Sequence, residues 1–336
     1  LRRPVTVKGN ASEATSMDER IGAIRQLFWN PEEKRLRAPV RIPVLFALVL
    51  LVVQLLFAVL AGIELLVTLP GPVTNAVVLV LATVAIAGLS WFIDRRRLRD
   101  LGLGGGRTWL VELLVGLGAG LAMSGVAVAT LAVAGAATIG SGTAAAPDIA
   151  LGGNAVGVFY GVVFFGGVGL LEEVLVRGYL LVNVAEGIRG FVDTDRTATL
   201  VGVVGTAGLF GVLHAANPGG TALSLVNISL AGLFFGLVYA MTGRLAFPIG
   251  IHITWNFGLG VLFGLPVSGL VTDTAVLAVE TTGRDLLTGG SFGPEGGLVM
   301  LVALAAGVVV FLAWMWLQGD TLSIDGEIAV PELWNG

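Results

Sequence analysis

The sequence predicts an all-α fold, a polytopic bundle of about eight transmembrane helices. Of its 336 residues, 55% are hydrophobic and only 12% are charged, and the mean hydropathy is +0.91. Soluble domains carry about 25% charged residues, so a water-soluble chain of this size could not cover so much apolar surface. Apolar runs of roughly twenty residues, the length that crosses the hydrocarbon core, recur along the chain.

Eight apolar runs are expected to be membrane helices. They cover residues 43–67, 73–93, 109–135, 154–183, 197–216, 221–243, 246–264 and 297–317. Helix-breaking sequences separate two neighbouring pairs, Pro-Gly-Pro at 70–72 and Asn-Pro-Gly-Gly at 217–220. The polar start of the chain and the length of the first apolar run predict no cleavable signal peptide.

Basic residues are distributed unequally between the two sides of the predicted bundle. The first 41 residues carry nine Lys or Arg and the loop 94–107 carries five more, whereas the opposite loops contain only Arg284. Basic loops face the cytoplasm, so eight spans place both termini there. The expected organisation is a cytoplasmic tail (1–41), a transmembrane domain (42–318) and an acidic C-terminal tail (319–336) in a multi-pass protein of the cell membrane.

Ionisable residues inside the predicted spans mark a candidate site, because each costs roughly 2.5–3.5 kcal/mol on insertion scales. They are Glu172, Glu173, Arg177, His214 and His252, with Glu64 and Glu112 nearer span ends, where interfacial charges are expected. Glu173 and Arg177 lie four residues apart on one helix face, so we expect them to pair. Glu172 points about 100° away from Glu173 and stays available as a general base. The alternative for this motif is a structural charge cluster.

The only two histidines each lie in an apolar span, four residues from a partner on the same face. Phe210 precedes His214 in the fifth span, and His252 precedes Asn256 in the seventh. Alone, each pair is explained as well by packing or by an interhelical hydrogen bond. Together with Glu172, they supply the groups that activate water and hold an oxyanion, with or without a metal. Imidazole and carboxylate also suit zinc.

Several absences narrow the chemistry. The chain has no cysteine, no His-Glu-x-x-His motif, no Gly-x-Ser-x-Gly elbow and no Walker A sequence, and no aspartate lies within a predicted span. These absences exclude thiolate chemistry and argue against the common zinc, serine and aspartyl protease designs. Basic residues are not interleaved with aromatic residues, so no nucleic-acid partner is expected.

Three short motifs follow one another on three apolar helices. They are Glu172-Glu173-x-x-x-Arg177, Phe210-x-x-x-His214 and His252-x-x-x-Asn256. In this order they resemble the signatures of the CPBP family (CAAX protease and bacteriocin-processing, or Abi), which are intramembrane glutamate/metallo-proteases and include the type II CAAX prenyl endopeptidases. The resemblance covers residues 95–264 and includes the lead-in Arg-Leu-Arg-Asp-Leu-Gly-Leu at 97–103. The N-terminal tail and the loop 265–296 lie outside it.

The resemblance implies an endopeptidase that acts on a membrane-associated peptide or protein, with a prenylated CAAX-like peptide among the candidate substrates. It implies that the residues matching Glu172 and His214 position and activate a water molecule, and that those matching His252 and Asn256 stabilise the oxyanion. It also implies a supporting role for Arg177. Glu173 completes the catalytic candidates, and Phe210 is a second supporting residue.

The resemblance leaves zinc binding open, because the role of a metal is disputed for the family. The zinc ligands would be Glu172, His214 and His252. Another class of function also stays open. A transporter or scaffold could use the same Glu/His cluster as a proton or ion site. Substrate identity and oligomeric state are not predicted by the sequence.

Straight helices place the three groups at different depths. At 1.5 Å per residue, Glu172, His214 and His252 would lie about 18, 26 and 10 Å from the cytoplasmic boundary. We therefore expect tilted helices, a deeper start for the fifth span, or a segment 184–196 that dips into the membrane.

Overall fold

Helices make up most of the computed structural model, which describes residues 28–62, 71–140 and 154–334. The long helices are α2 (Ala38–Gly62), α4 (Gly71–Leu89), α5 (Arg107–Val133), α6 (Asn154–Glu173), α8 (Asp195–Leu213), α9 (Ala222–Thr242) and α12 (Val299–Gln318). The short ones are α7 (Val182–Ile188), α10 (Ala246–Phe257) and α11 (Asp285–Thr288). Only two small sheets occur within these ranges, each of two strands. The predicted all-α polytopic fold is confirmed.

Seven helical stretches in the described part of the chain are long and apolar enough to cross a membrane. They correspond to seven of the eight predicted spans. The remaining span, the seventh along the chain, was predicted at 246–264. It consists of α10 and a π-helical turn after it, and the two together cover only Ala246–Leu262. Nearly all of α10 is buried against α5, α6 and α9. A helix surrounded by protein need not match the thickness of the bilayer, which explains its short length.

The fourth predicted span is longer than its apolar run. Predicted to end at residue 183, it continues from α6 through a π-helix (Val174–Leu181) and α7 to a 3₁₀ turn at Arg189–Phe191. Helical structure therefore extends over Ala155–Phe191. The π-helix begins directly after Glu173, and such segments are frequent at functional sites because they change the direction of side chains within a helix.

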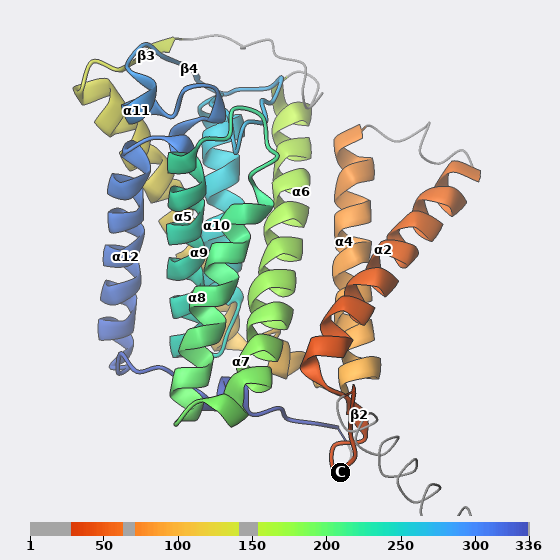
Figure 1. Ribbon diagram of the computed structural model, residues 1–336. Coiled ribbons are helices and arrows are strands. Elements are labelled where there is room, and N and C mark those ends of the chain that lie inside the picture. The colour runs from red at the N-terminus through yellow and green to blue at the C-terminus, as the bar shows by residue number, and fades with distance from the viewer. Residues whose placement is uncertain (1–27, 63–70, 141–153, 335–336) are drawn as a thin grey trace, which may run out of the picture.

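The helices form one bundle with a peripheral pair (Figure 1). Helices α5, α8, α9, α10 and α12 pack together, α6 lies beside them, and α4 packs on α6. Helix α2 contacts α4 and α7 near one end and leans away from the bundle at the other. Little of α2 is buried in the protein, as expected for a helix whose apolar surface faces lipid.

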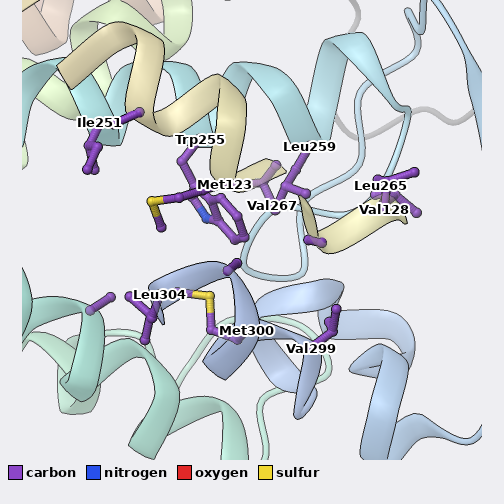
Figure 2. Packing of buried hydrophobic residues seen from close by; sticks show 14 of the residues in the cluster. Met123, Val128, Ile251, Trp255, Leu259, Leu265, Val267, Val299, Met300 and Leu304 are labelled. Atoms are coloured by element: carbon purple, nitrogen blue, oxygen red, sulfur yellow. The ribbon is translucent and has the colours of Figure 1, made fainter. Parts of the chain in front are cut away.

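Helices α5 and α10 pack closely, and two glycines of α5 make this possible. A Cβ atom on Gly116 would lie 2.4 Å from the Phe247 carbonyl oxygen, and one on Gly120 would lie 2.4 Å from the Ile251 carbonyl oxygen. Small residues let membrane helices approach closely. The core continues outward from this contact through Trp255 and neighbouring apolar side chains of α5, α10 and α12 (Figure 2). Helix α10 is thus held firmly along its length.

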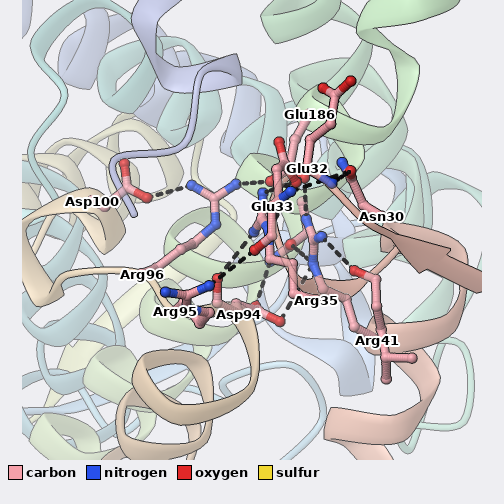
Figure 3. A network of polar contacts seen from close by, with 12 residues as sticks. Asn30, Glu32, Glu33, Arg35, Arg41, Asp94, Arg95, Arg96, Asp100 and Glu186 are labelled. Carbon is pink, nitrogen blue, oxygen red and sulfur yellow. Dashed lines mark hydrogen bonds and ion pairs between the residues drawn. The ribbon is translucent and has the colours of Figure 1, made fainter. Parts of the chain in front are cut away.

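A network of buried ion pairs (Figure 3) lies where α2 begins, at the end of the bundle called here the inner end (Figure 1). A hairpin of β1 (Trp29–Asn30) and β2 (Arg35–Leu36) precedes α2 and packs there. Arg35 and Arg41 each bind Glu186 of α7, and Arg96 contacts Glu186 and Asp100. Burial lowers the pKa of Arg35 from its ordinary value. Part of the predicted N-terminal tail is thus built into the bundle.

The C-terminal segment returns to the same inner end. The backbone N–H of Asp325 donates to the Ala240 carbonyl oxygen, and that of Trp334 donates to the Arg95 carbonyl oxygen. The indole of Trp334 stacks on Trp91, with ring centroids 5.0 Å apart. Both ends of the described chain therefore lie on one side of the bundle, as an even number of crossings requires; that this side is cytoplasmic stays a prediction.

The opposite, outer end carries the long loop that precedes α12. Strand β4 (Ala278–Thr281) of this loop pairs antiparallel with β3 (Ala137–Gly140), which follows α5. Farther along the loop, Phe292 is fully buried and packs with Val176 and Phe210. The loop 265–296 is therefore a packed part of the fold that covers the outer end.

Candidate active site

A cavity of about 390 Å³ lies inside the bundle, and most of the predicted site residues line it. They are Glu172, Phe210, His214, His252 and Asn256, contributed by α6, α8, the residue that ends α8, and α10. The remaining predicted residues, Glu173 and Arg177, are fully buried next to it. Side chains far apart in the sequence are thus brought to one place.

Glu172 and His214 lie at similar depths, unlike the estimate from straight helices that end with their apolar runs. Glu172 lies nineteen residues before Phe191, where its helix ends, and His214 lies nineteen residues after Asp195, where α8 begins. Both are therefore about 28 Å from the turn that joins the two helices. The straight-helix estimate differed because it ended the fourth span at its last apolar residue, whereas the helix continues to Phe191.

The short helix α10 starts deeper than its neighbours, and this places His252. The Leu245 N–H donates to the Gly102 carbonyl oxygen, and a Cβ atom on Gly178 would lie 3.2 Å from the Leu245 side chain. Leu245 is therefore level with Gly178, which is six residues beyond Glu172. His252 is seven residues beyond Leu245, so both groups lie about 10 Å from the same level.

Glu173 and Arg177 form the predicted ion pair. Arg177 Nη1 donates to Glu173 Oε1 at 2.8 Å, and Nη2 donates to the Gly232 carbonyl oxygen at 3.3 Å. The guanidinium carbon lies 4.4 Å from the centre of the Phe210 ring, a cation–π contact. The paired charges, the backbone acceptor and the ring together make burial of the arginine tolerable.

Glu173 has a second partner that the motif spacing did not predict. The same oxygen, Oε1, accepts a hydrogen bond from His252 Nδ1 at 2.7 Å. The carboxylate therefore fixes the ring orientation and leaves Nε2 directed elsewhere. Nε2 lies 3.7 Å from Glu172 Oε2. Arg177, Glu173 and His252 form a buried relay that ends at the cavity.

Glu172 offers an unused acceptor to the cavity. Its Oε2 atom is buried and has no hydrogen-bond partner among the described residues. Buried carboxylate oxygens are rarely left unpaired, and a polar cavity of this size has room for water. The remaining contact of this atom, with His252 Nε2, is longer than a direct hydrogen bond. The position suits a water molecule held by Glu172.

His214 is oriented by its own helix. Its Nδ1 atom lies 2.8 Å from the Phe210 carbonyl oxygen and donates to it, which leaves Nε2 as the free nitrogen. The imidazole also packs edge-on against the Phe210 ring, with centroids 4.7 Å apart. Phe210 thus supports both Arg177 and His214. Asn256 lies one turn beyond His252 on α10, where its amide can donate into the cavity.

The arrangement does not by itself form a metal site. Within the ranges that the structure describes, no group of three or more His, Asp or Glu side chains is placed to hold a metal ion. As arranged, the predicted ligands Glu172, His214 and His252 do not fit the tetrahedral site that zinc prefers. Zinc binding stays a prediction, and we derive no catalytic step through it.

Of the two carboxylates predicted near span ends, Glu64 and Glu112, the structure describes only Glu112. Glu64 lies outside the described residues. Glu112 is not an interfacial charge, because it is buried and accepts hydrogen bonds from Arg244 Nε at 2.7 Å and Nη2 at 2.5 Å. These hydrogen bonds raise the pKa of Arg244. The pair joins α5 to the start of α10 and so helps to set the depth of that helix.

The outer loop contributes residues to the cavity that were not among the predicted site residues. Val267, Ser268, Leu270 and Glu295 all line the cavity, together with Trp255. Glu295 stands in a glycine-rich loop outside the predicted spans, where a charged residue is not unusual. A single sequence offers no signal that such a loop folds back into the bundle.

Comparison with known families supports the motif assignment. Residues 154–258 match the family model of Rce1-like type II CAAX prenyl endopeptidases. This stretch contains all three motifs, so the match confirms the resemblance to the CAAX protease family. Comparison with curated proteins and with solved structures gave no match.

Proposed function

We propose that this membrane protein is an intramembrane endopeptidase, with Glu172 and His214 activating water and His252 and Asn256 stabilising the oxyanion. The observation that carries the proposal is the buried, unpartnered Oε2 of Glu172, which shares one cavity with two oriented imidazoles. The family match over residues 154–258 supports a hydrolase of the protease type.

The proposed reaction begins with a water molecule between Glu172 and His214. Glu172 accepts a proton from this water, and the resulting hydroxide attacks the carbonyl carbon of the scissile peptide bond. Negative charge develops on the carbonyl oxygen, where Asn256 and a protonated Nε2 of His252 can donate hydrogen bonds. Glu172 then gives its proton to the departing amine. One water is consumed, and one carboxyl and one amino terminus are formed.

Glu173 and Arg177 act in this scheme by holding His252. Because Glu173 accepts from Nδ1, the ring cannot rotate without breaking a buried hydrogen bond. Arg177 donates to the same carboxylate oxygen and so fixes the orientation of the Glu173 side chain. We therefore assign these two residues to positioning, although the sequence placed Glu173 among the catalytic candidates.

The cavity suits a substrate that carries an apolar group next to the scissile bond. Its apolar lining includes Met123, Phe164, Phe165, Val168, Ile228 and Met300. An isoprenoid or another lipid-like chain could lie against these side chains while the peptide faces Glu172. We therefore propose a membrane-associated peptide or protein as substrate, with a prenylated CAAX-like peptide as the first candidate.

The test is peptide cleavage by purified protein in lipid nanodiscs. We expect Glu172→Gln to lower the turnover of a fluorogenic prenylated peptide by about 100-fold or more, as loss of a general base does. Glu280→Gln is the matched control, because Glu280 is exposed on β4. Unchanged turnover in a folded Glu172→Gln variant would contradict the proposal. Proton-coupled uptake into vesicles that depends on Glu172 would favour a transporter instead.

A further inference from the structure

Glu295 is a buried carboxylate on the outer loop, beyond the part of the chain that matches the family. Only 4% of it is exposed, and both of its oxygens are hydrogen-bonded. Oε1 accepts from Trp255 Nε1 at 2.8 Å, and Oε2 accepts from the Ser268 backbone N–H at 2.5 Å and hydroxyl at 2.8 Å. Because three donors converge on this one carboxylate, its loss would leave buried donors without acceptors.

The partners of Glu295 connect the two elements that carry the histidines. Trp255 lies on α10, three residues after His252 and one before Asn256. On the other side, the Ser268 carbonyl oxygen accepts from Asn217 Nδ2 at 3.0 Å. The backbone N–H of Asn217 in turn donates to the His214 carbonyl oxygen. A continuous hydrogen-bonded path therefore runs from the His214 segment through Ser268 and Glu295 to α10.

The backbone of the loop is constrained at the centre of this path. Ser268 has a φ of +48°, a left-handed conformation that is uncommon for a residue with a side chain. Next to it, a Cβ atom on Gly269 would lie only 2.0 Å from the Pro218 carbonyl oxygen. Strained conformations persist where surrounding contacts over-determine them, and they cluster at functional sites. The loop is thus held tightly against the end of α8.

We infer that Glu295 is a positioning residue of the proposed active site, which sets the separation between His214 and the His252–Asn256 face of α10. This inference rests on the proposed function. It gives the cavity two supports: Glu173 holds the His252 ring through Nδ1, and Glu295 holds the helix beneath it through Trp255. Catalytic groups must be held within fractions of an ångström, so loss of either support lowers the rate of the chemical step.

The first test separates the chemical step from substrate binding. Glu295→Gln keeps the shape of the side chain but leaves one acceptor oxygen for three donors, and Trp255→Phe removes only the indole N–H. We expect kcat to fall on the order of 10- to 100-fold in each variant, with KM within about twofold of the unmodified value. The double variant should be no slower than the slower single variant, because the two substitutions interrupt the same hydrogen-bonded path. Glu280→Gln, in the same loop and exposed, should behave like the unmodified protein.

Two kinetic results would overturn the inference. One is a kcat within about twofold of the unmodified value in both single variants. The other is a double variant whose loss equals the product of the two single losses, because that result would place the two residues in separate roles.

A second measurement needs no substrate. Hydrogen exchange of the backbone amides at 213–218 and 251–257 should be faster in Glu295→Gln and unchanged in Glu280→Gln. Equal exchange in both variants would overturn the bridge. If the unmodified protein cleaves no peptide, the proposed function fails, but the exchange result still decides whether Glu295 holds the two segments together.

Discussion

Removal of one charge from the Glu173–Arg177 pair should destabilise the protein more than removal of both. Arg177→Met keeps much of the side-chain volume but takes away the only guanidinium that contacts Glu173 in the described residues. Glu173 is 0% exposed, so its charge cannot reach water. After the substitution it keeps a single hydrogen-bond donor, His252 Nδ1.

The expected magnitude follows from burial and from the contacts that are lost. Breaking a buried ion pair by removing one partner costs about 3–5 kcal/mol, because an uncompensated charge remains in the protein. Loss of the guanidinium over the Phe210 ring adds about 0.5–2 kcal/mol. Glu173→Gln alone leaves Arg177 unpaired and should be similarly costly. The double variant removes both charges of the pair and should recover at least about 2 kcal/mol relative to Arg177→Met.

The assay is equilibrium unfolding of the purified protein in mixed micelles with a rising fraction of SDS, followed by far-ultraviolet circular dichroism. The two single variants and the double variant are compared with the unmodified chain under identical lipid and salt conditions. A double variant as unstable as Arg177→Met, or less stable, would refute the reasoning. It would show that lost packing, not an unpaired charge, determines the cost.

Two further predictions concern how helices are held around the site. Gly120→Val should force α5 away from α10, because even a Cβ would lie 2.4 Å from the Ile251 carbonyl oxygen. We expect both the folding equilibrium constant and the rate of peptide cleavage to fall by more than about tenfold. Gly118→Val, where a Cβ meets nothing within 4 Å, is the matched control for both measurements. At the inner end, Arg96→Met should cost about 3–5 kcal/mol in the same SDS titration, because the buried guanidinium contacts two carboxylates. Arg97→Met, at an exposed position, should change stability by less than about 0.5 kcal/mol, and equal losses in the two variants would contradict a structural role for the buried cluster.

Most of the fold could be predicted from composition and from the length of apolar runs. A chain with so few charges has to place its helices in lipid, and twenty-residue runs set where they begin and end. The predictions failed where burial in protein replaced burial in lipid. Helix α10 is shorter than the other crossings because its neighbours cover it. The fourth helix continues beyond its apolar run to Glu186, which pairs with Arg35 and Arg41. Neither condition is visible in hydropathy.

The site divides in the same way between local and distant contacts. One helical turn separates Glu173 from Arg177 and Phe210 from His214, and spacing alone predicted that each pair would meet. The hydrogen bond from His252 to Glu173 joins residues 79 positions apart, and no periodicity encodes it. The role of Glu295 depends on a loop folding back over the bundle, which leaves no pattern in the sequence.

The sequence by itself determined a helical membrane protein with three polar motifs, because apolar length and i, i+4 spacing are properties of single helices. Only the tertiary structure decided which atoms face the cavity, which carboxylate orients which imidazole, and that the outer loop closes the site. Those outcomes depend on the depth and rotation of one helix against another. They are set by small-residue contacts such as Gly116 and Gly120, and by buried ion pairs between segments far apart in the chain.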